Sequence, residues 1–96
     1  AVEIDPNSAV FRYKLGRAYL AAGRPDQAGE QATTALTLTG DPAQQAAIQT
    51  LIGDVARQRG DTPGATAAYN QALQLDPGQL SAQLGLGLVA VGQGNW

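Results

Sequence analysis

The sequence has no cysteine, no histidine and no methionine among its 96 residues, and aromatic residues are few. The missing thiol and imidazole groups exclude a disulfide framework, the commonest zinc ligands and the usual catalytic base. Charged residues are also scarce, with six Lys plus Arg against eight Asp plus Glu, so the formal net charge is −2. A mildly acidic chain lacks the basic surface on which nucleic-acid binding depends. We therefore expect no metal or other cofactor, no nucleic-acid partner and no enzymatic activity.

Most of the remaining sequence is small and apolar or neutral, and alanine is the commonest residue. No apolar run approaches the ~18 residues of a membrane-spanning helix, so no direct membrane insertion is expected. The acidic residues are scattered, and no two of them form a pattern that suggests acid–base catalysis. These features indicate a small, mildly acidic domain whose function does not depend on a reactive side chain.

The sequence repeats itself with a period of 34 to 37 residues. Three segments share an apolar residue, a glycine, two variable residues and a residue able to pack: Leu15–Tyr19, Ile52–Ala56 and Leu86–Ala90. Gly53 follows Gly16 by 37 residues, whereas Gly87 follows Gly53 by 34. The three additional residues lie near 39–44, so we expect an insertion there.

Within each repeat, apolar residues recur at helical spacing. We therefore expect five helices, at about 8–22, 25–38, 42–59, 62–75 and 79–92. Gly23 and Gly60 are placed to end helices, and a proline follows each of them within the first turn of the next helix. Asp41 is placed as an N-cap.

Glycines inside the expected helices need a reason, because each costs up to ~1 kcal/mol relative to alanine. Gly16, Gly53 and Gly87 occupy the same place in successive repeats, which predicts close approach of two helices at that place. Gly85 has no counterpart in the other repeats. No close contact is expected at Gly85, so the last helix should be the least stable.

These motifs and their period resemble the tetratricopeptide repeat. The Leu-Gly-x2-Tyr element of the family is matched by Leu15–Tyr19, and its Ala-x3-aromatic element by Ala65 and Tyr69. The first unit departs from the pattern, since Ala32 replaces the aromatic residue. Positions where the family often has tryptophan carry Arg12, Gln49 and Gln83. The resemblance implies an all-α fold, a right-handed α-solenoid of antiparallel helix pairs with about two and a half repeats.

The repeat boundaries divide the chain into four parts. Residues 1–6 match the end of a preceding second helix, 7–40 and 41–77 form two units, and 78–96 hold the first helix of a further unit. The second unit carries the three-residue insertion. We therefore expect the chain to be an excerpt of a longer repeat protein.

For function, the resemblance implies a concave side, lined by the first helix of each unit, that binds a peptide or a partner protein. The first helices also carry a second, non-core stripe whose members fall at matching positions in successive units. The candidate groove residues on this stripe are Tyr13, Arg17, Thr50, Asp54, Arg57, Ser81, Leu84, Leu88 and Val91. Tyr13 is the strongest candidate, because an aromatic ring supplies contact area at low entropic cost.

The candidate residues also have structural interpretations. Leu84, Leu88 and Val91 are expected to contact a second helix or the next unit, and the alternatives are a hydrophobic ligand patch or a self-association surface. For Arg17 and Asp54, an ion pair across the groove is the alternative to anchoring a partner. For Tyr13, packing against Arg17 is the alternative to a binding role.

Two functions therefore compete. The first is a protein–protein interaction scaffold that binds a protein or peptide partner in its groove. The second is a structural or oligomerisation module that propagates or stacks a superhelix, with self-association through uncapped repeat ends. Some members of the family grip a chaperone's C-terminal carboxylate with basic residues. That clamp is not supported, because the third unit has Ser81, Leu84 and Gly85 where basic residues would be needed.

Overall fold

The structure is a computed structural model that describes residues 8–92. It contains five α-helices: α1 (Ala9–Ala21), α2 (Pro25–Thr37), α3 (Pro42–Gln58), α4 (Thr62–Leu75) and α5 (Leu80–Gly92). No strand occurs within residues 8–92. The expected all-α fold is confirmed, and every expected helix boundary lies within one residue of the observed one. The segment 1–6, expected to end a preceding helix, lies outside the described residues, as does the end of the last expected unit.

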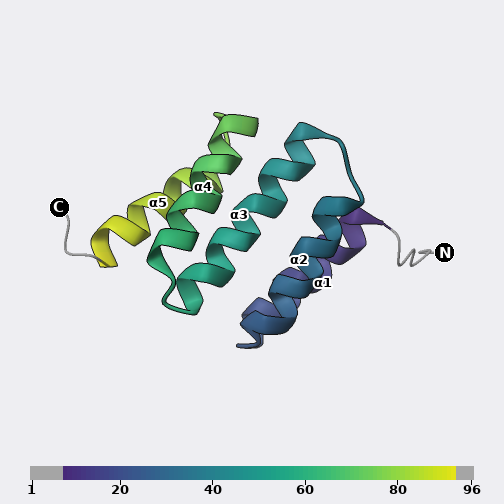
Figure 1. Cartoon of the computed structure of the whole chain (residues 1–96), viewed down its shortest axis with the longest axis horizontal. Coiled ribbons are helices and arrows are strands. Elements are labelled where there is room, and N and C mark those ends of the chain that lie inside the picture. The colour runs from purple at the N-terminus through teal and green to yellow at the C-terminus, as the bar shows by residue number, and fades with distance from the viewer. Residues whose placement is uncertain (1–7, 93–96) are drawn as a thin grey trace.

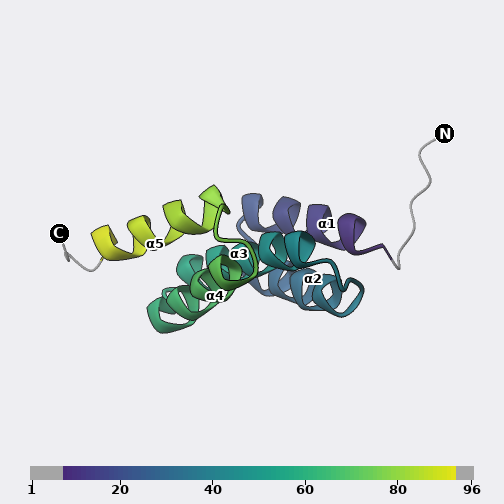
Figure 2. The same cartoon turned by 90° about the horizontal axis from the view of Figure 1, so that it is seen from above.

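The helices form two layers (Figures 1 and 2). The first-helix layer contains α1, α3 and α5, which neighbour one another in that order, and the second-helix layer contains α2 and α4. Each helix packs antiparallel against the one before it, but α2 and α4 do not contact each other. The result is an elongated body of 48 × 28 × 20 Å. Within the described chain, no helix is both long and apolar enough to cross a membrane.

Local sequence signals fix the helix ends. The expected N-cap is confirmed, because the Asp41 carboxylate accepts a hydrogen bond from the Ala43 amide at 3.1 Å. Gly23 and Gly60 both have a φ angle of +78°, the left-handed conformation that glycine adopts without steric cost at a helix end. Both inter-helix turns were therefore predictable from these glycines and the prolines that follow.

α3 is one turn longer at its N-terminus than the other first helices. By repeat spacing, Ala46 is equivalent both to Ala9, the first residue of α1, and to Leu80, the first residue of α5. α3 instead begins at Pro42. The additional residues thus form an extra turn, Pro42–Gln45.

The core is built mainly from small residues in two clusters. The first joins α2 and α3 and holds Ala28, Ala32, Ala35, Ile48, Leu51 and Val55. The second lies among α3, α4 and α5 and surrounds Tyr69. Tyr69 and Ile48 are the largest side chains that are fully buried. Small residues let the helices approach closely, so few large side chains suffice to fill the interior.

Close helix–helix approach is confirmed at Gly16 and Gly53. A Cβ added to Gly16 would lie 2.9 Å from Leu51 Cδ2 and 3.2 Å from the Ala28 carbonyl oxygen. A Cβ added to Gly53 would lie 2.6 Å from Cε1 of the Tyr69 ring. A Cβ at Gly53 would therefore overlap the buried Tyr69 ring, whereas a Cβ at Gly16 would require Leu51 to shift.

In α5 the close contact lies at Gly85 and not at Gly87, which is the reverse of the prediction. A Cβ added to Gly85 would overlap the Tyr69 ring, whereas a Cβ added to Gly87 would meet nothing within 4 Å. The prediction that Gly85 makes no close contact was therefore wrong. The physical reason is the size of Tyr69, whose ring reaches from α4 to both first helices of its interface.

The two interfaces between successive first helices are filled in opposite ways. At the first, the small Ala32 of α2 accompanies the large Leu51 of α3. At the second, the equivalent positions are a large Tyr69 in α4 and a small Gly85 in α5. Each interface has one large and one small member, so the aromatic residue missing from the first unit is replaced by Leu51.

Candidate functional site

The strongest sequence candidate, Tyr13, lies on the first-helix layer beside Arg17. The Arg17 guanidinium carbon is 5.7 Å from the centroid of the Tyr13 ring, within the range of a cation–π contact. Tyr13 is half-buried against the first core cluster, whereas Arg17 is exposed. The predicted packing of Tyr13 against Arg17 is therefore present. It leaves part of the ring and the cation on the surface.

Beside Tyr13, the first-helix layer contains an apolar hollow of about 320 Å³ between α1 and α3. Its lining residues are Ala9, Val10, Tyr13, Lys14, Ala43, Gln44, Ala47 and Ile48. Ile48 is 1 % exposed and Ala9 is 8 % exposed, so they form its floor, while Val10 remains 44 % exposed at its side. An apolar hollow with a few polar groups around it is the usual form of a ligand site.

Further along α3, Asp54 and Arg57 form a network with Tyr69 of α4. The Tyr69 hydroxyl donates a hydrogen bond to the Asp54 carboxylate, and Arg57 Nε donates one to the Tyr69 hydroxyl at 3.3 Å. Arg57 Nη2 also lies 3.6 Å from Asp54 Oδ1. The ion pair between Arg17 and Asp54 is not formed, because the carboxylate is occupied by partners within its own helix pair.

This network shifts the titration of two of its members. Burial of the Tyr69 hydroxyl, followed by its hydrogen bond to Asp54, raises the pKa of Tyr69 to about 12. The hydrogen bond with Tyr69 raises the pKa of Arg57 above its usual value, and nearby Asp54 adds to the effect. Tyr69 is thus a core residue, as expected, whose hydroxyl also holds two of the candidate residues in place. Its hydroxyl was the one available signal, because a buried phenol needs a partner.

Thr50 does not face a partner, contrary to the prediction. Its side chain is 4 % exposed, and its hydroxyl donates a hydrogen bond to the Ala46 carbonyl oxygen at 2.9 Å. Ala46 belongs to the core cluster shared with α4. Thr50 is therefore buried, whereas Ala47 before it lines the hollow and Asp54 after it is partly exposed.

The four predicted residues of α5 are all exposed. Ser81 is on the surface, and Leu84, Leu88 and Val91 are 65 %, 44 % and 52 % exposed. By repeat spacing, the leucines and the valine are equivalent to the α3 residues Thr50, Asp54 and Arg57. Thr50 is buried, and the other two bond to Tyr69 of α4. Their equivalence favours the interpretation that this face of α5 contacts a further second helix.

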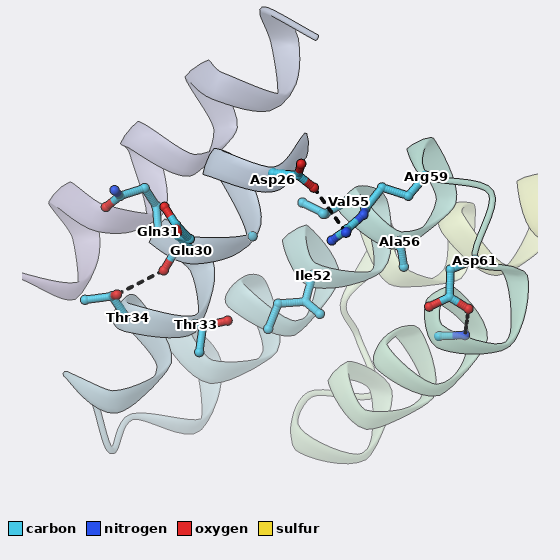
Figure 3. A pocket seen from close by; sticks show the side chains of 12 residues that line it. Asp26, Glu30, Gln31, Thr33, Thr34, Ile52, Val55, Ala56, Arg59 and Asp61 are labelled. Carbon is cyan, nitrogen blue, oxygen red and sulfur yellow. Dashed lines mark hydrogen bonds and ion pairs between the residues drawn. The ribbon is translucent and has the colours of Figure 1, made fainter. Parts of the chain in front are cut away.

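A larger groove that sequence reasoning missed lies on the second-helix layer. It occupies about 1030 Å³ between α2 and α4, over the outer side of α3 (Figure 3). Ile52, Val55 and Ala56 line it from α3, and most other lining residues are polar. Arg59 bridges to Asp26 at 3.1 Å within it. No periodic signal pointed to this groove, because it results from the absence of contact between α2 and α4.

The described residues offer little for metal binding. Within 8–92, no group of three or more acidic side chains lies close enough together to hold a metal ion. The carboxylate with the most elaborate surroundings, Asp54, accepts from Tyr69 and pairs with Arg57. These contacts are structural ones within a single helix pair.

Comparison with known families agrees with the helical architecture. A family model described as tetratricopeptide repeat matches residues 13–79 and, in a second overlapping match, residues 50–96. Tetratricopeptide repeats generally mediate protein–protein interactions and are typically non-catalytic modules. Because the two matches together extend over residues 13–96, the chain belongs to the tetratricopeptide repeat family.

Proposed function

We propose that this chain is a protein-interaction scaffold that binds a peptide or a segment of a partner protein on its first-helix layer. The observation that carries the proposal is the apolar hollow between α1 and α3, with Tyr13 in its wall. The hollow is open without any rearrangement of the helices, so little ordering has to accompany binding. Tyr13 and Arg17 at its side are residue types that often dominate binding energy.

The larger groove on the second-helix layer supports partner binding less well. Most of its lining is polar, and Asp26 and Arg59 already satisfy each other at 3.1 Å. A partner would have to compete with that pair and to desolvate the polar side chains around it. The smaller hollow offers apolar contact with few polar groups to desolvate.

The proposal includes no catalytic role. A reaction would need an activated base or nucleophile within reach of a substrate. On the proposed face, the carboxylate of Asp54 is held by Tyr69 and Arg57, and Asp54 does not line the hollow.

Peptides selected from a random displayed library test the proposal. Peptides that bind the parent chain should lose most of their affinity for Ala47→Leu, because the added side chain occupies the hollow. Ala67→Leu in α4 is the matched control, since Ala67 is exposed and does not line the hollow. Equal binding to the parent and both variants would show that the hollow is not the site.

A second candidate function, homo-oligomer assembly, is favoured by α5. Leu80, Leu84, Leu88 and Val91 are the exposed apolar side chains of that helix, and Leu80 is 75 % exposed. Contiguous patches of this kind mark association surfaces. Light scattering after size exclusion would support assembly if a concentration-dependent dimer became monomeric in the Leu84→Ser/Leu88→Ser variant. A 9.9 kDa monomer at every concentration would reject it.

We also propose the unit boundaries 7–40, 41–77 and 78–96. The support is the equivalence of Ala46 to the first residues of α1 and α5, together with the extra turn that precedes it in α3. Under this division, α5 is the first helix of a unit whose second helix would cover Leu84 and Leu88.

A further inference from the structure

The extra turn of α3 has a consequence for the hollow. Two of its residues, Ala43 and Gln44, form one wall, and α1 supplies the opposite wall with Val10 and Tyr13. α1 and α5 have no equivalent turn, since both begin at positions that correspond to Ala46. The hollow is therefore a feature of this particular insertion and not of the repeat pattern as such.

Hydrogen bonds hold the extra turn in place. The Thr39 hydroxyl donates to Gln44 Oε1 at 2.5 Å and accepts from the Asp41 amide at 3.1 Å. Gln45 Nε2 donates to the Thr39 carbonyl oxygen at 3.2 Å. Together with the Asp41 cap on Ala43, these bonds tie the turn to the segment before it. The wall of the hollow is thus pre-formed.

The size of the hollow limits what it can hold. At about 320 Å³ it lies at the lower end of the range for ligand sites, which is roughly 300–1,000 Å³. Its floor is apolar, with Ile48 only 1 % exposed. These dimensions suit a single bulky apolar side chain and the backbone that carries it.

Lys14 is the one charged residue among those that line the hollow, although the chain as a whole carries −2. α1 contains Arg12, Lys14 and Arg17 and no acidic residue. Lys14 lines the hollow, and Arg17 is held over the Tyr13 ring. Arg12 is directed elsewhere, because its guanidinium donates to Gln31 of α2 at 2.9 Å.

No carboxylate of the described chain neutralises the two cations beside the hollow. Between residues 8 and 92, the ion pairs formed are Arg57–Asp54 and Arg59–Asp26. Asp54 is the carboxylate at the position equivalent to Arg17, and it is engaged with Tyr69 and Arg57. Lys14 and Arg17 are therefore available to a partner's negative charge.

We propose that the hollow binds an acidic segment of a partner protein, with one bulky apolar side chain seated between α1 and α3. Carboxylates next to that side chain lie against Lys14 and Arg17. This inference rests on the proposed function of the first-helix layer and adds the chemistry of the partner. Recognition depends on internal residues of the segment and needs no free C-terminal carboxylate.

Four dye-labelled peptides, each capped at its C-terminus as an amide, test the inference by fluorescence anisotropy. Their core sequences are Asp-Glu-Phe-Glu-Asp, Asp-Glu-Ala-Glu-Asp, Ser-Gln-Phe-Gln-Ser and Lys-Arg-Phe-Arg-Lys. The affinity of the acidic Phe peptide should be at least about tenfold higher than that of the acidic Ala peptide, because only the Phe peptide buries a ring. Its advantage over the neutral Phe peptide should disappear as salt rises from ~0.05 to ~0.5 M.

Charge-reversal variants test whether Lys14 and Arg17 are the residues that attract the acidic Phe peptide. Lys14→Glu and Arg17→Glu should each weaken the acidic Phe peptide by about threefold or more at low salt. Arg24→Glu is the matched control, because it makes the same charge change at an exposed residue that does not line the hollow. It should change the affinity by less than about twofold.

The outcomes separate this inference from the proposed function. If the basic or neutral Phe peptide binds as tightly as the acidic one and Ala47→Leu abolishes binding, the inference that the partner segment is acidic is refuted. Binding in the hollow is then still supported. If no Phe peptide binds at ~1 mM, the inference is overturned, and the selected library peptides decide the proposed function independently. Equal effects of Arg24→Glu and Lys14→Glu would also overturn it.

Discussion

Replacing Tyr69 with alanine should cause a large loss of stability. The Tyr69 side chain is 0 % exposed and its ring touches both Gly53 and Gly85. Truncating such an aromatic residue typically costs about 3–5 kcal/mol, because the surrounding helices cannot close the cavity. A chain of this length is expected to have about 5–14 kcal/mol in total. Tyr69→Ala should therefore remove a large fraction of the stability.

The interface between α3 and α5 can be given the same arrangement of large and small side chains as the interface between α1 and α3. Gly85→Leu alone should destabilise by about 1–3 kcal/mol, because its side chain overlaps the Tyr69 ring, although a leucine gains helix propensity over glycine. In the Tyr69→Ala/Gly85→Leu double variant, the leucine has the space of the missing ring. This pair reproduces the Ala32 and Leu51 arrangement. A favourable coupling of about 0.5–3 kcal/mol is expected.

Urea unfolding followed by far-UV circular dichroism measures all four members of the cycle. The control is Tyr69→Phe, which keeps the ring and should lose about 1.5–3 kcal/mol, because the lost hydroxyl bonds to charged groups. Additivity of the two single changes within about 0.5 kcal/mol would refute the reasoning. A Gly85→Leu variant as stable as the parent would refute it as well.

Three further predictions concern single positions. Gly87→Ala should raise the free energy of unfolding by up to ~1 kcal/mol, because the site is open, whereas Gly60→Ala should lower it by about 1–2 kcal/mol, because its φ is +78°. Thermal unfolding of the two variants should therefore shift in opposite directions. Asp41→Ala should cost about 1 kcal/mol through loss of the cap on Ala43, while the exposed change Asn70→Ala serves as its control in the same assay. The raised pKa of Tyr69, about 12 against 10.0 in the unfolded chain, predicts a stability contribution that is complete below pH 10 and is lost as the pH approaches 12. Urea unfolding across this range should show that loss in the parent and a smaller one in Tyr69→Phe, and identical profiles would contradict the assignment.

The sequence was sufficient for the helices and for most of their ends. Apolar spacing, Gly23, Gly60 and Asp41 are local signals, and each acts on residues within a turn or two of itself. The close approach at Gly16 and Gly53 was also predictable, because the same residue recurs at the same place in two units.

Contacts between helices were less predictable, because they depend on which side chain fills a shared space. Gly85 has no partner in the repeat pattern, because the ring beside it belongs to Tyr69 of the neighbouring helix α4. Repeat spacing placed Arg17 beside Asp54, but neighbouring helix axes are 8–10 Å apart. Asp54 instead takes the nearer partners, Arg57 in its own helix and the Tyr69 hydroxyl.

The hollow needed the structure as well. The insertion was visible in the repeat arithmetic, but its placement as an extra turn of α3 against Tyr13 follows from how α1 and α3 pack. The groove between α2 and α4 is likewise a product of spacing between elements, which no residue pattern encodes.

The most direct test of the account is amide chemical-shift mapping of the isotope-labelled chain during titration with a library-selected peptide. If the peptide binds in the hollow, the largest shifts fall in residues 9–14 and 43–48, on its two sides. Largest shifts in residues 29–34 and 59–64 would place the partner in the groove of the second-helix layer and contradict the account.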